Sequence, residues 1–207
     1  MDPYHFPIPI ETFLLTAPKI SLAYPQIIWA LNPFIQNTIN RAIIQQANEL
    51  LHTIQKQGYY KLSSTEVLLN YEIKNNQRGI LSLTLSSFAN TFSLAHPVDG
   101  LTSITTDTYS GNIYQLQDLF QPNSPYVEHI STEIKLQIKQ RNLPLFKQFE
   151  SIRPNQDFYI ADKALIIFFQ RYEIGPRPLG YPIFPISIYS LEDIIKKDGP
   201  LGIMLPN

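Results

Sequence analysis

The chain has 207 residues, of which 44% are hydrophobic and 12% aromatic, so it carries enough apolar material to bury a core and is not a disordered chain. Sixteen basic and 17 acidic residues give a formal charge of −1. Without a basic stripe, this balance argues against a nucleic-acid-binding protein. The absence of cysteine excludes disulfides, thiolate zinc sites and cysteine nucleophiles.

The N-terminal stretch lacks the pattern of a secretory signal. Asp2 and Glu11 flank prolines at positions where a signal peptide needs a basic region followed by an unbroken apolar stretch. The longest apolar run, Ala164 to Phe169, is far shorter than the roughly 18 residues of a membrane span. We therefore expect a soluble, cytoplasmic chain with no membrane span.

The first part of the chain predicts two extended segments followed by a long amphipathic helix. Residues 12–15 and 19–24 are apolar segments among prolines, as is typical of edge strands. From Pro33 onward, apolar residues recur every three or four positions, which indicates one buried helix face. Asn32 fits as the N-cap of this helix and Gly58 as its end. The expected buried stripe is Ile35, Ile39, Ile43, Ala47, Leu50 and Ile54.

The middle of the chain changes to the two-residue period of β-strands. Residues 65–74 form one predicted strand, and residues 75–79 supply turn chemistry. Leucine alternates with serine or threonine over residues 81–86, which predicts a half-buried strand. A further β-rich stretch follows over residues 101–111.

The last part predicts a helix, a hairpin, a loop and a final strand. The helix is expected over residues 124–141, and the hairpin strands over residues 157–161 and 164–170. The second hairpin strand is continuously apolar, which is typical of a central strand. A strand over residues 183–188 and a short helix over residues 191–196 complete the order.

This order of elements predicts an α+β fold, an antiparallel β-sheet with two main helices packed on it. Strands that follow one another without regular helical crossovers favour antiparallel pairing. We expect a single unit over residues 1–207, with a division into two lobes, residues 1–122 and 123–207, as the alternative.

No sequence motif indicates a catalytic site, a metal or a cofactor, and we expect none of the three. The histidines lack the spacing of a metal site, and the glycine loops of nucleotide sites and the GxSxG turn do not occur. His96 stands apart because it lies in a loop three residues before Asp99. A histidine there could bind a ligand or transfer a proton, and the alternative is a turn residue whose ring caps local carbonyl groups.

The segment RYEIGPRPLGYP, after the apolar strand, combines side chains that recognition loops favour. Aromatic and arginine side chains held among prolines and glycines are good binding surfaces. The alternative is that its tyrosine and glutamate only close the end of the sheet. The predicted ligand-binding residues are His96, Asp99, Tyr172, Glu173, Arg177 and Tyr181.

The region from Phe158 to Gly180 carries the motif F-Y-x-x-D-x-x-L-x-x-x-F-x-x-Y-E-I-x-P-x-x-x-G, followed by a strand that contains Pro185. Its positions are occupied by Phe158, Tyr159, Asp162, Leu165, Phe169, Tyr172, Glu173, Ile174, Pro176, Gly180 and Pro185. With this motif the chain resembles a bacterial domain of unknown function. That domain occurs in RsiV, the lysozyme-sensing anti-sigma factor, and in PdaC-type peptidoglycan deacetylases.

Upstream features extend the resemblance to about residues 60–196. Residues 95–97, 105–109 and 118–120 match, in order, the family's histidine loop, its Tyr- and Thr-rich strand and its Asp-Leu-Phe step. Ser93 and Leu94 replace two family glycines, which affects the conformation expected of the histidine loop because glycine readily adopts positive φ.

The resemblance implies a non-catalytic binding module. In RsiV-like proteins the domain lies outside the membrane and recognises lysozyme, and in PdaC-like proteins it accompanies a separate deacetylase domain. The implied lobes are a PdaC-like one over residues 1–122 and an RsiV-like one over residues 123–207. The implied ligand is a protein such as lysozyme or a cell-envelope glycan.

Two other classes of function stay open at this point. One is a small intracellular enzyme or regulator, in concrete terms a hydrolase centred on His96 and Asp99. The other is a structural protein that oligomerises by burying part of its proline-rich N-terminal strands.

Overall fold

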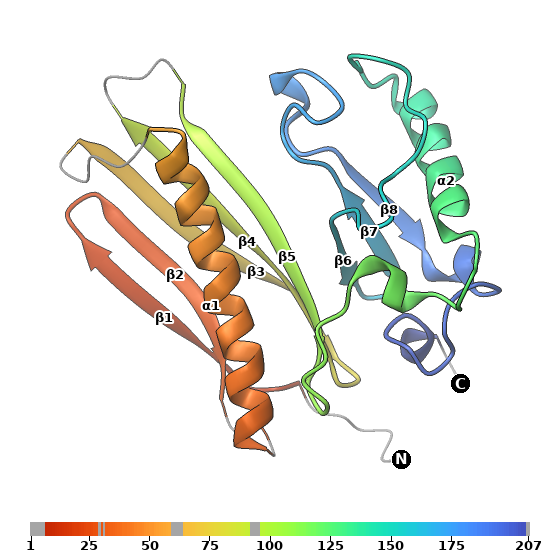
Figure 1. Ribbon diagram of the computed structural model, residues 1–207, viewed down its shortest axis with the longest axis horizontal. Coiled ribbons are helices and arrows are strands. Elements are labelled where there is room, and N and C mark those ends of the chain that lie inside the picture. The colour runs from red at the N-terminus through yellow and green to blue at the C-terminus, as the bar shows by residue number, and fades with distance from the viewer. Residues whose placement is uncertain (1–6, 29, 31, 59–63, 92–95, 206–207) are drawn as a thin grey trace. The chain divides into compact units, whose positions relative to one another are not determined.

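The computed structural model describes residues 7–28, 30, 32–58, 64–91 and 96–205 (Figure 1). The chain divides into two compact units, Met1–Ile113 and Tyr114–Asn207. Each unit has its own β-sheet and its own long helix.

The first unit is a five-stranded sheet with one long helix across a face (Figure 1). Its strands lie side by side in chain order: β1 (Ile10–Ala17), β2 (Ile20–Ile27), β3 (Thr65–Gln77), β4 (Ile80–Thr91) and β5 (Val98–Asp107). β2 and β3 are parallel, and the other neighbours are antiparallel. A parallel pair needs a long crossover, and helix α1 (Pro33–Lys56) provides it.

Helix α1 begins directly after the N-cap residue that the sequence predicts, Asn32. The Asn32 side chain accepts a hydrogen bond from the Phe34 N–H at 2.9 Å, and Pro33 occupies the first turn, which confirms the predicted N-cap. Neither α1 nor any other helix in the described part of the chain is long and apolar enough to cross a membrane.

The predicted apolar stripe of α1 packs on the sheet. Its buried members are Ile39, Ile43, Ala47, Leu50 and Ile54, while Ile35 is half-buried. Four of these five side chains share a core cluster with strand residues that include Leu69, Leu81, Leu83, Leu85 and Ile104. Burial of this stripe against the sheet supplies the main stabilisation of the first unit.

Strand β4 is buried on both faces, although its alternating sequence predicted one solvated face. Ser82 and Thr84 are buried together with the leucines between and beside them. The Ser82 and Thr105 hydroxyls share a hydrogen bond of 2.7 Å, which satisfies two polar groups that burial would otherwise destabilise. A two-residue turn at Arg78 and Gly79, with φ of 54° and 76°, connects β3 to β4.

The second unit is a three-stranded antiparallel sheet with helix α2 (Tyr126–Arg141) beside it. The strands are β6 (Phe158–Ala161), β7 (Ala164–Phe168) and β8 (Ile183–Ser187). The continuously apolar β7 lies in the centre, as predicted. Short 3₁₀ helices occur at Leu116–Leu119, Arg177–Leu179, Ile188–Leu191 and Gly202–Met204.

Helix α2 closes the outer edge of β8. Gln137 Nε2 donates to the Pro185 carbonyl and Arg141 Nη1 donates to the Ile183 carbonyl, each at 2.8 Å. The Arg141 guanidinium also lies 5.3 Å from the centre of the Phe184 ring. Since Pro185 has no N–H to offer, this edge has few free groups with which another strand could pair.

The α+β class is confirmed, but the prediction of one antiparallel sheet carrying both helices is wrong. The structure has two sheets, and the α1 crossover makes one pair of strands parallel. The helix predicted over residues 191–196 is also wrong. A 3₁₀ turn covers Ile188–Leu191, and Ile195 then forms a bridge with Phe120. In this bridge the Ile194 carbonyl accepts from the Gln121 N–H and the Lys196 N–H donates to the Leu119 carbonyl, so neither group continues a helix.

Two apolar residues within one turn of α2, one buried and one exposed, test this description of the second unit. Ile134 is 0% exposed and Leu136 is 50% exposed. We expect Ile134→Ala to lower the free energy of unfolding by about 2–5 kcal/mol, because it leaves a cavity. Leu136→Ala should change it by less than about 0.5 kcal/mol. Urea denaturation of both variants measures the difference, and equal effects would contradict the orientation of α2.

Candidate functional site

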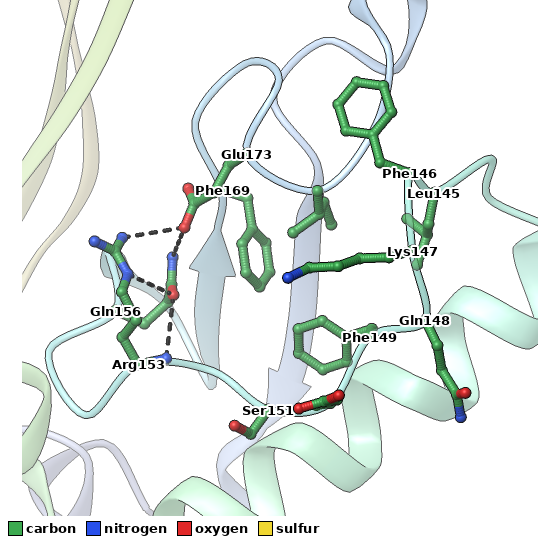
Figure 2. Close-up of a pocket in the computed structure, with 12 residues that line it drawn as sticks. Leu145, Phe146, Lys147, Gln148, Phe149, Ser151, Arg153, Gln156, Phe169 and Glu173 are labelled. Atoms are coloured by element: carbon green, nitrogen blue, oxygen red, sulfur yellow. Dashed lines mark hydrogen bonds and ion pairs between the residues drawn. The ribbon is translucent and has the colours of Figure 1, made fainter.

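A cavity of about 370 Å³ opens in the second unit. One wall comes from residues 145–156, in the connection between α2 and β6, and the other from residues 169–174, which follow β7 (Figure 2). The volume is within the range of small-ligand sites, about 300–1,000 Å³. The cavity is therefore our candidate site.

Phenyl rings form the apolar part of the cavity. Phe149 meets Phe169 edge to face, with ring centres 5.8 Å apart and an angle of 89°. Phe169 meets Phe184 of β8 in the same way, at 5.6 Å and 90°. Phe169 and Phe184 are buried and Phe149 is half-buried. This series of rings ties the cavity wall to the core of the unit.

The Glu173 carboxylate joins the two walls. It forms an ion pair with Arg153, with Nη2 at 3.2 Å, and accepts a hydrogen bond from Gln156 Nε2 at 3.4 Å, both on the opposite wall (Figure 2). Its other oxygen accepts from the Gln170 N–H at 2.6 Å. The ion pair is partly exposed and contributes at most about 1 kcal/mol to stability by itself. The effect of these contacts is positional, because they hold both walls in one arrangement.

A second tie lies at the other end of the cavity. The Phe146 N–H donates to the Ile174 carbonyl at 3.1 Å. Next to it, a Cβ on Gly175 would lie 2.6 Å from the Pro144 carbonyl oxygen, so a larger residue would push the two segments apart. The walls are thus joined on both sides of the cavity.

Helix α2 anchors the first wall. The Ile152 N–H donates to Ser131 Oγ at 3.0 Å, and the Tyr126 hydroxyl donates to the Pro154 carbonyl at 2.9 Å. Burial, and to a smaller extent the charge of Asp118, raise the pKa of Tyr126 above its ordinary value of 10.0. The hydroxyl therefore keeps the proton that it donates.

Lys147 brings a positive charge to the cavity. Figure 2 shows its side chain extending into the cavity toward the rings of Phe149 and Phe169. Glu150 also lines the cavity, yet Lys147 makes no ion pair with any residue that the structure describes. A cation beside apolar rings favours a ligand group that combines an apolar face with a negative charge.

The predicted ligand-binding residues are distributed over both units. His96 lies at an exposed bend before β5, and Asp99 lies within β5. The four others, Tyr172, Glu173, Arg177 and Tyr181, lie in the segment between β7 and β8. Of these six residues, Glu173 lines the cavity. Ser93 and Leu94, which the sequence resemblance aligned with two glycines, lie outside the described residues.

Tyr172 projects from a strained turn. Its φ is 66°, in the left-handed region that a non-glycine residue adopts at a cost, and its side chain is exposed. The Glu173 N–H donates to the Gln170 carbonyl at 3.0 Å, and the Glu173 carboxylate accepts from the Gln170 N–H. The turn is closed from both ends, which maintains the strained conformation.

Arg177 and Tyr181 both hold Arg171. The Arg171 guanidinium lies 5.3 Å from the centre of the Tyr181 ring, and its Nη1 donates to the Arg177 carbonyl at 3.2 Å. In this hydrogen bond Arg177 uses its backbone carbonyl and not its side chain. These contacts brace the segment that carries Tyr172 and Glu173.

Sequence reasoning missed the wall formed by residues 145–156. This segment has neither a helical nor a strand period, so no pattern marked its side chains as neighbours of Glu173. The available signal was compositional, because Phe146 and Phe149 flank Lys147 in a segment rich in polar residues.

The part of the chain that contains the cavity matches a known family model. Residues 117–189 match the family model described as "Protein of unknown function (DUF3298)". The cavity walls, residues 145–156 and 169–174, fall within this range.

Two crystal structures resemble the whole chain. One is a DUF3298 family protein from Pseudomonas aeruginosa PAO1, 16% identical, with a TM-score of 0.71 and 98% of each chain covered. The other is a DUF3298 family member from Bacteroides fragilis NCTC 9343, 11% identical, with a TM-score of 0.71, covering 95% of this chain and 97% of that one. These likenesses show a shared fold. No curated protein matches the sequence.

The positive φ of Tyr172 predicts that glycine at this position gives a more stable protein than alanine does. We expect Tyr172→Gly to be more stable than Tyr172→Ala by about 0.5–1 kcal/mol, because glycine adopts positive φ without a steric penalty. Both variants remove the exposed ring, so their difference reports the backbone. Equilibrium urea denaturation measures it, and an alanine variant as stable as the glycine variant would contradict the left-handed conformation.

Proposed function

We propose that this chain is a non-catalytic binding module whose cavity in the second unit receives part of the ligand. The proposed ligand is a protein such as lysozyme or a cell-envelope glycan, the classes that the resemblance to RsiV-like and PdaC-like domains implies. The observation that carries the proposal is the cavity itself, pre-formed by ties on two sides and lined by phenyl rings beside Lys147.

The charged groups around the cavity have a positional role. The Glu173 carboxylate forms an ion pair with Arg153 and accepts hydrogen bonds from Gln156 Nε2 and from the Gln170 N–H. These contacts hold the carboxylate in one place and join the two walls, which supports a binding role. Glu173 and Arg153 thus act on the shape of the cavity.

Pre-formed walls also favour affinity. A loop that becomes ordered on binding subtracts its entropy loss from the binding free energy, whereas a loop that is already held does not. Here both walls are fixed before any ligand arrives, by Glu173, by the Phe146–Ile174 bond and by the contacts with α2. The volume, near the lower limit for ligand sites, suits one ring or one side chain of a larger ligand.

The chemistry of the lining defines the group that enters. Phe149 and Phe169 offer apolar rings, against which the C–H face of a sugar or an aliphatic side chain can pack. Lys147 offers an ammonium group to a carboxylate at the mouth. Muropeptides carry both features, and a protein ligand would present them on a side chain and a neighbouring acidic group.

Isothermal titration calorimetry with c-type lysozyme and, separately, with muropeptide fragments tests the proposal. We expect saturable binding to one of them. Lys147→Gln should weaken it about tenfold or more, because a hydrogen bond to a charged group contributes about 1.5–3 kcal/mol. The matched control is Lys135→Gln, which removes an exposed lysine of α2 and should leave the affinity unchanged.

Two results would contradict this proposal. Failure of both ligands to bind would remove the proposed ligand classes. Binding that survives both Lys147→Gln and Phe149→Ala would exclude the cavity as the contact site. Circular dichroism of each variant confirms that a lost affinity is not a lost fold.

The alternative, a hydrolase centred on His96 and Asp99, makes a different prediction. If it holds, His96→Ala should abolish turnover of a chromogenic ester or glycoside without changing the fold, because general base catalysis needs the imidazole. Under our proposal the wild-type chain has no such turnover, and His96→Ala keeps the affinity of the cavity for its ligand. The two measurements on one variant therefore separate the two classes of function.

A further inference from the structure

Strand β1 is an apolar edge strand with both faces open. It lies at one end of the five-stranded sheet and pairs on one side with β2 (Figure 1). Phe13, Leu14 and Leu15 are 47%, 63% and 55% exposed. Because successive side chains of a strand project to opposite faces, these three residues expose apolar surface on both faces of the sheet.

Within the part of the chain that the structure describes, β1 lacks the features that usually keep an edge strand from pairing with another chain. Such features are lysines, prolines, bulges or a covering segment. Ile10–Ala17 contains neither lysine nor proline, and its register with β2 runs without a bulge. The edge of β8, by contrast, contains Pro185 and is capped by Gln137 and Arg141.

The free backbone groups of β1 belong to alternate residues. The Ile28 N–H donates to the Pro9 carbonyl at 2.9 Å, so the odd-numbered residues of this strand bond to β2. Pro25 lies opposite Thr12, a non-hydrogen-bonded position that suits a residue without an N–H. The residues that direct their N–H and C=O groups to the open edge are therefore Ile10, Thr12, Leu14 and Thr16.

We propose that two copies of this chain associate by antiparallel pairing of β1 about a two-fold axis at Leu14. Two identical edges can bond only through their free groups, so even-numbered residues must meet even-numbered residues. An axis at Leu14 satisfies this condition, since it places Leu14 opposite itself and Thr12 opposite Thr16. The two five-stranded sheets then form one continuous sheet.

Side chains also match in this register. Phe13 lies opposite Leu15, an aromatic–aliphatic pair of the kind that stabilises neighbouring strands. Glu11, which is the charged residue of β1, lies opposite Ala17, so the two carboxylates do not meet. The strand is thus complementary to itself in hydrogen bonding, apolar contact and charge, which is why a second copy is the partner that we propose.

This inference is independent of the cavity and its ligand. It concerns the first unit, and its test needs no ligand. It gives a specific form to the oligomerising role that the proline-rich N-terminal strands suggested, and a chain can both self-associate through β1 and bind a ligand elsewhere.

Sedimentation velocity over a concentration series of the full chain tests the proposal. We expect the wild type to reach the mass of a dimer and Leu14→Lys to stay a monomer, because the substitution places two ammonium groups at the axis. Leu136→Lys is the control, since Leu136 is exposed to a similar degree on α2 and lies outside the proposed interface. It should remain a dimer.

A single cysteine tests the register. The chain has no cysteine, so Leu14→Cys introduces one thiol per copy. Directly opposed residues of a hydrogen-bonded pair have Cα atoms about 5.5 Å apart, which suits a disulfide. Mild oxidation should give a covalent dimer for Leu14→Cys and not for Leu136→Cys. A wild type that is monomeric at all concentrations, or a dimer that survives Leu14→Lys, would overturn the proposal.

Discussion

The Glu173 carboxylate is the contact on which the candidate site depends. Its ion pair with Arg153 and its hydrogen bond from Gln156 join the two cavity walls, and its hydrogen bond from the Gln170 backbone fixes its own segment. Ordering a residue's backbone costs about 1–2 kcal/mol, so loops of this length need several such contacts to keep one shape. One carboxylate supplies them at a position where a ligand would otherwise have to order the loops itself.

The edge strand β8 of the second unit is covered, whereas the edge strand β1 of the first unit is exposed, and the reason lies in the local sequence. In the second unit, Pro185 interrupts β8, and polar side chains of α2 occupy its remaining carbonyl groups. In the first unit, α1 packs mainly on β2, β4 and β5, and most of β1 is exposed. A closed edge suits a unit that keeps a rigid cavity, and an open edge suits a unit that joins another strand.

Local patterns predicted the elements well, whereas the arrangement of those elements depends on contacts distant in sequence. The α1 stripe, its Asn32 cap and the central position of β7 follow from periodicity and capping chemistry. The parallel pairing of β2 with β3 does not, because strand direction is set by where the α1 crossover returns. The candidate site shows the same limit: Glu173 was marked by its loop, but Lys147 is its neighbour across a cavity only after folding.

The sequence motif from Phe158 to Gly180 describes how the cavity is framed. Phe158, Leu165 and Phe169 are buried, Asp162 and Gly180 have the positive φ of turn residues, and Glu173 ties the walls. Lys147 and Phe149, which face the cavity, lie outside the motif. A motif of this kind specifies a shape and leaves the lining free to differ. A shared frame therefore does not imply a shared function.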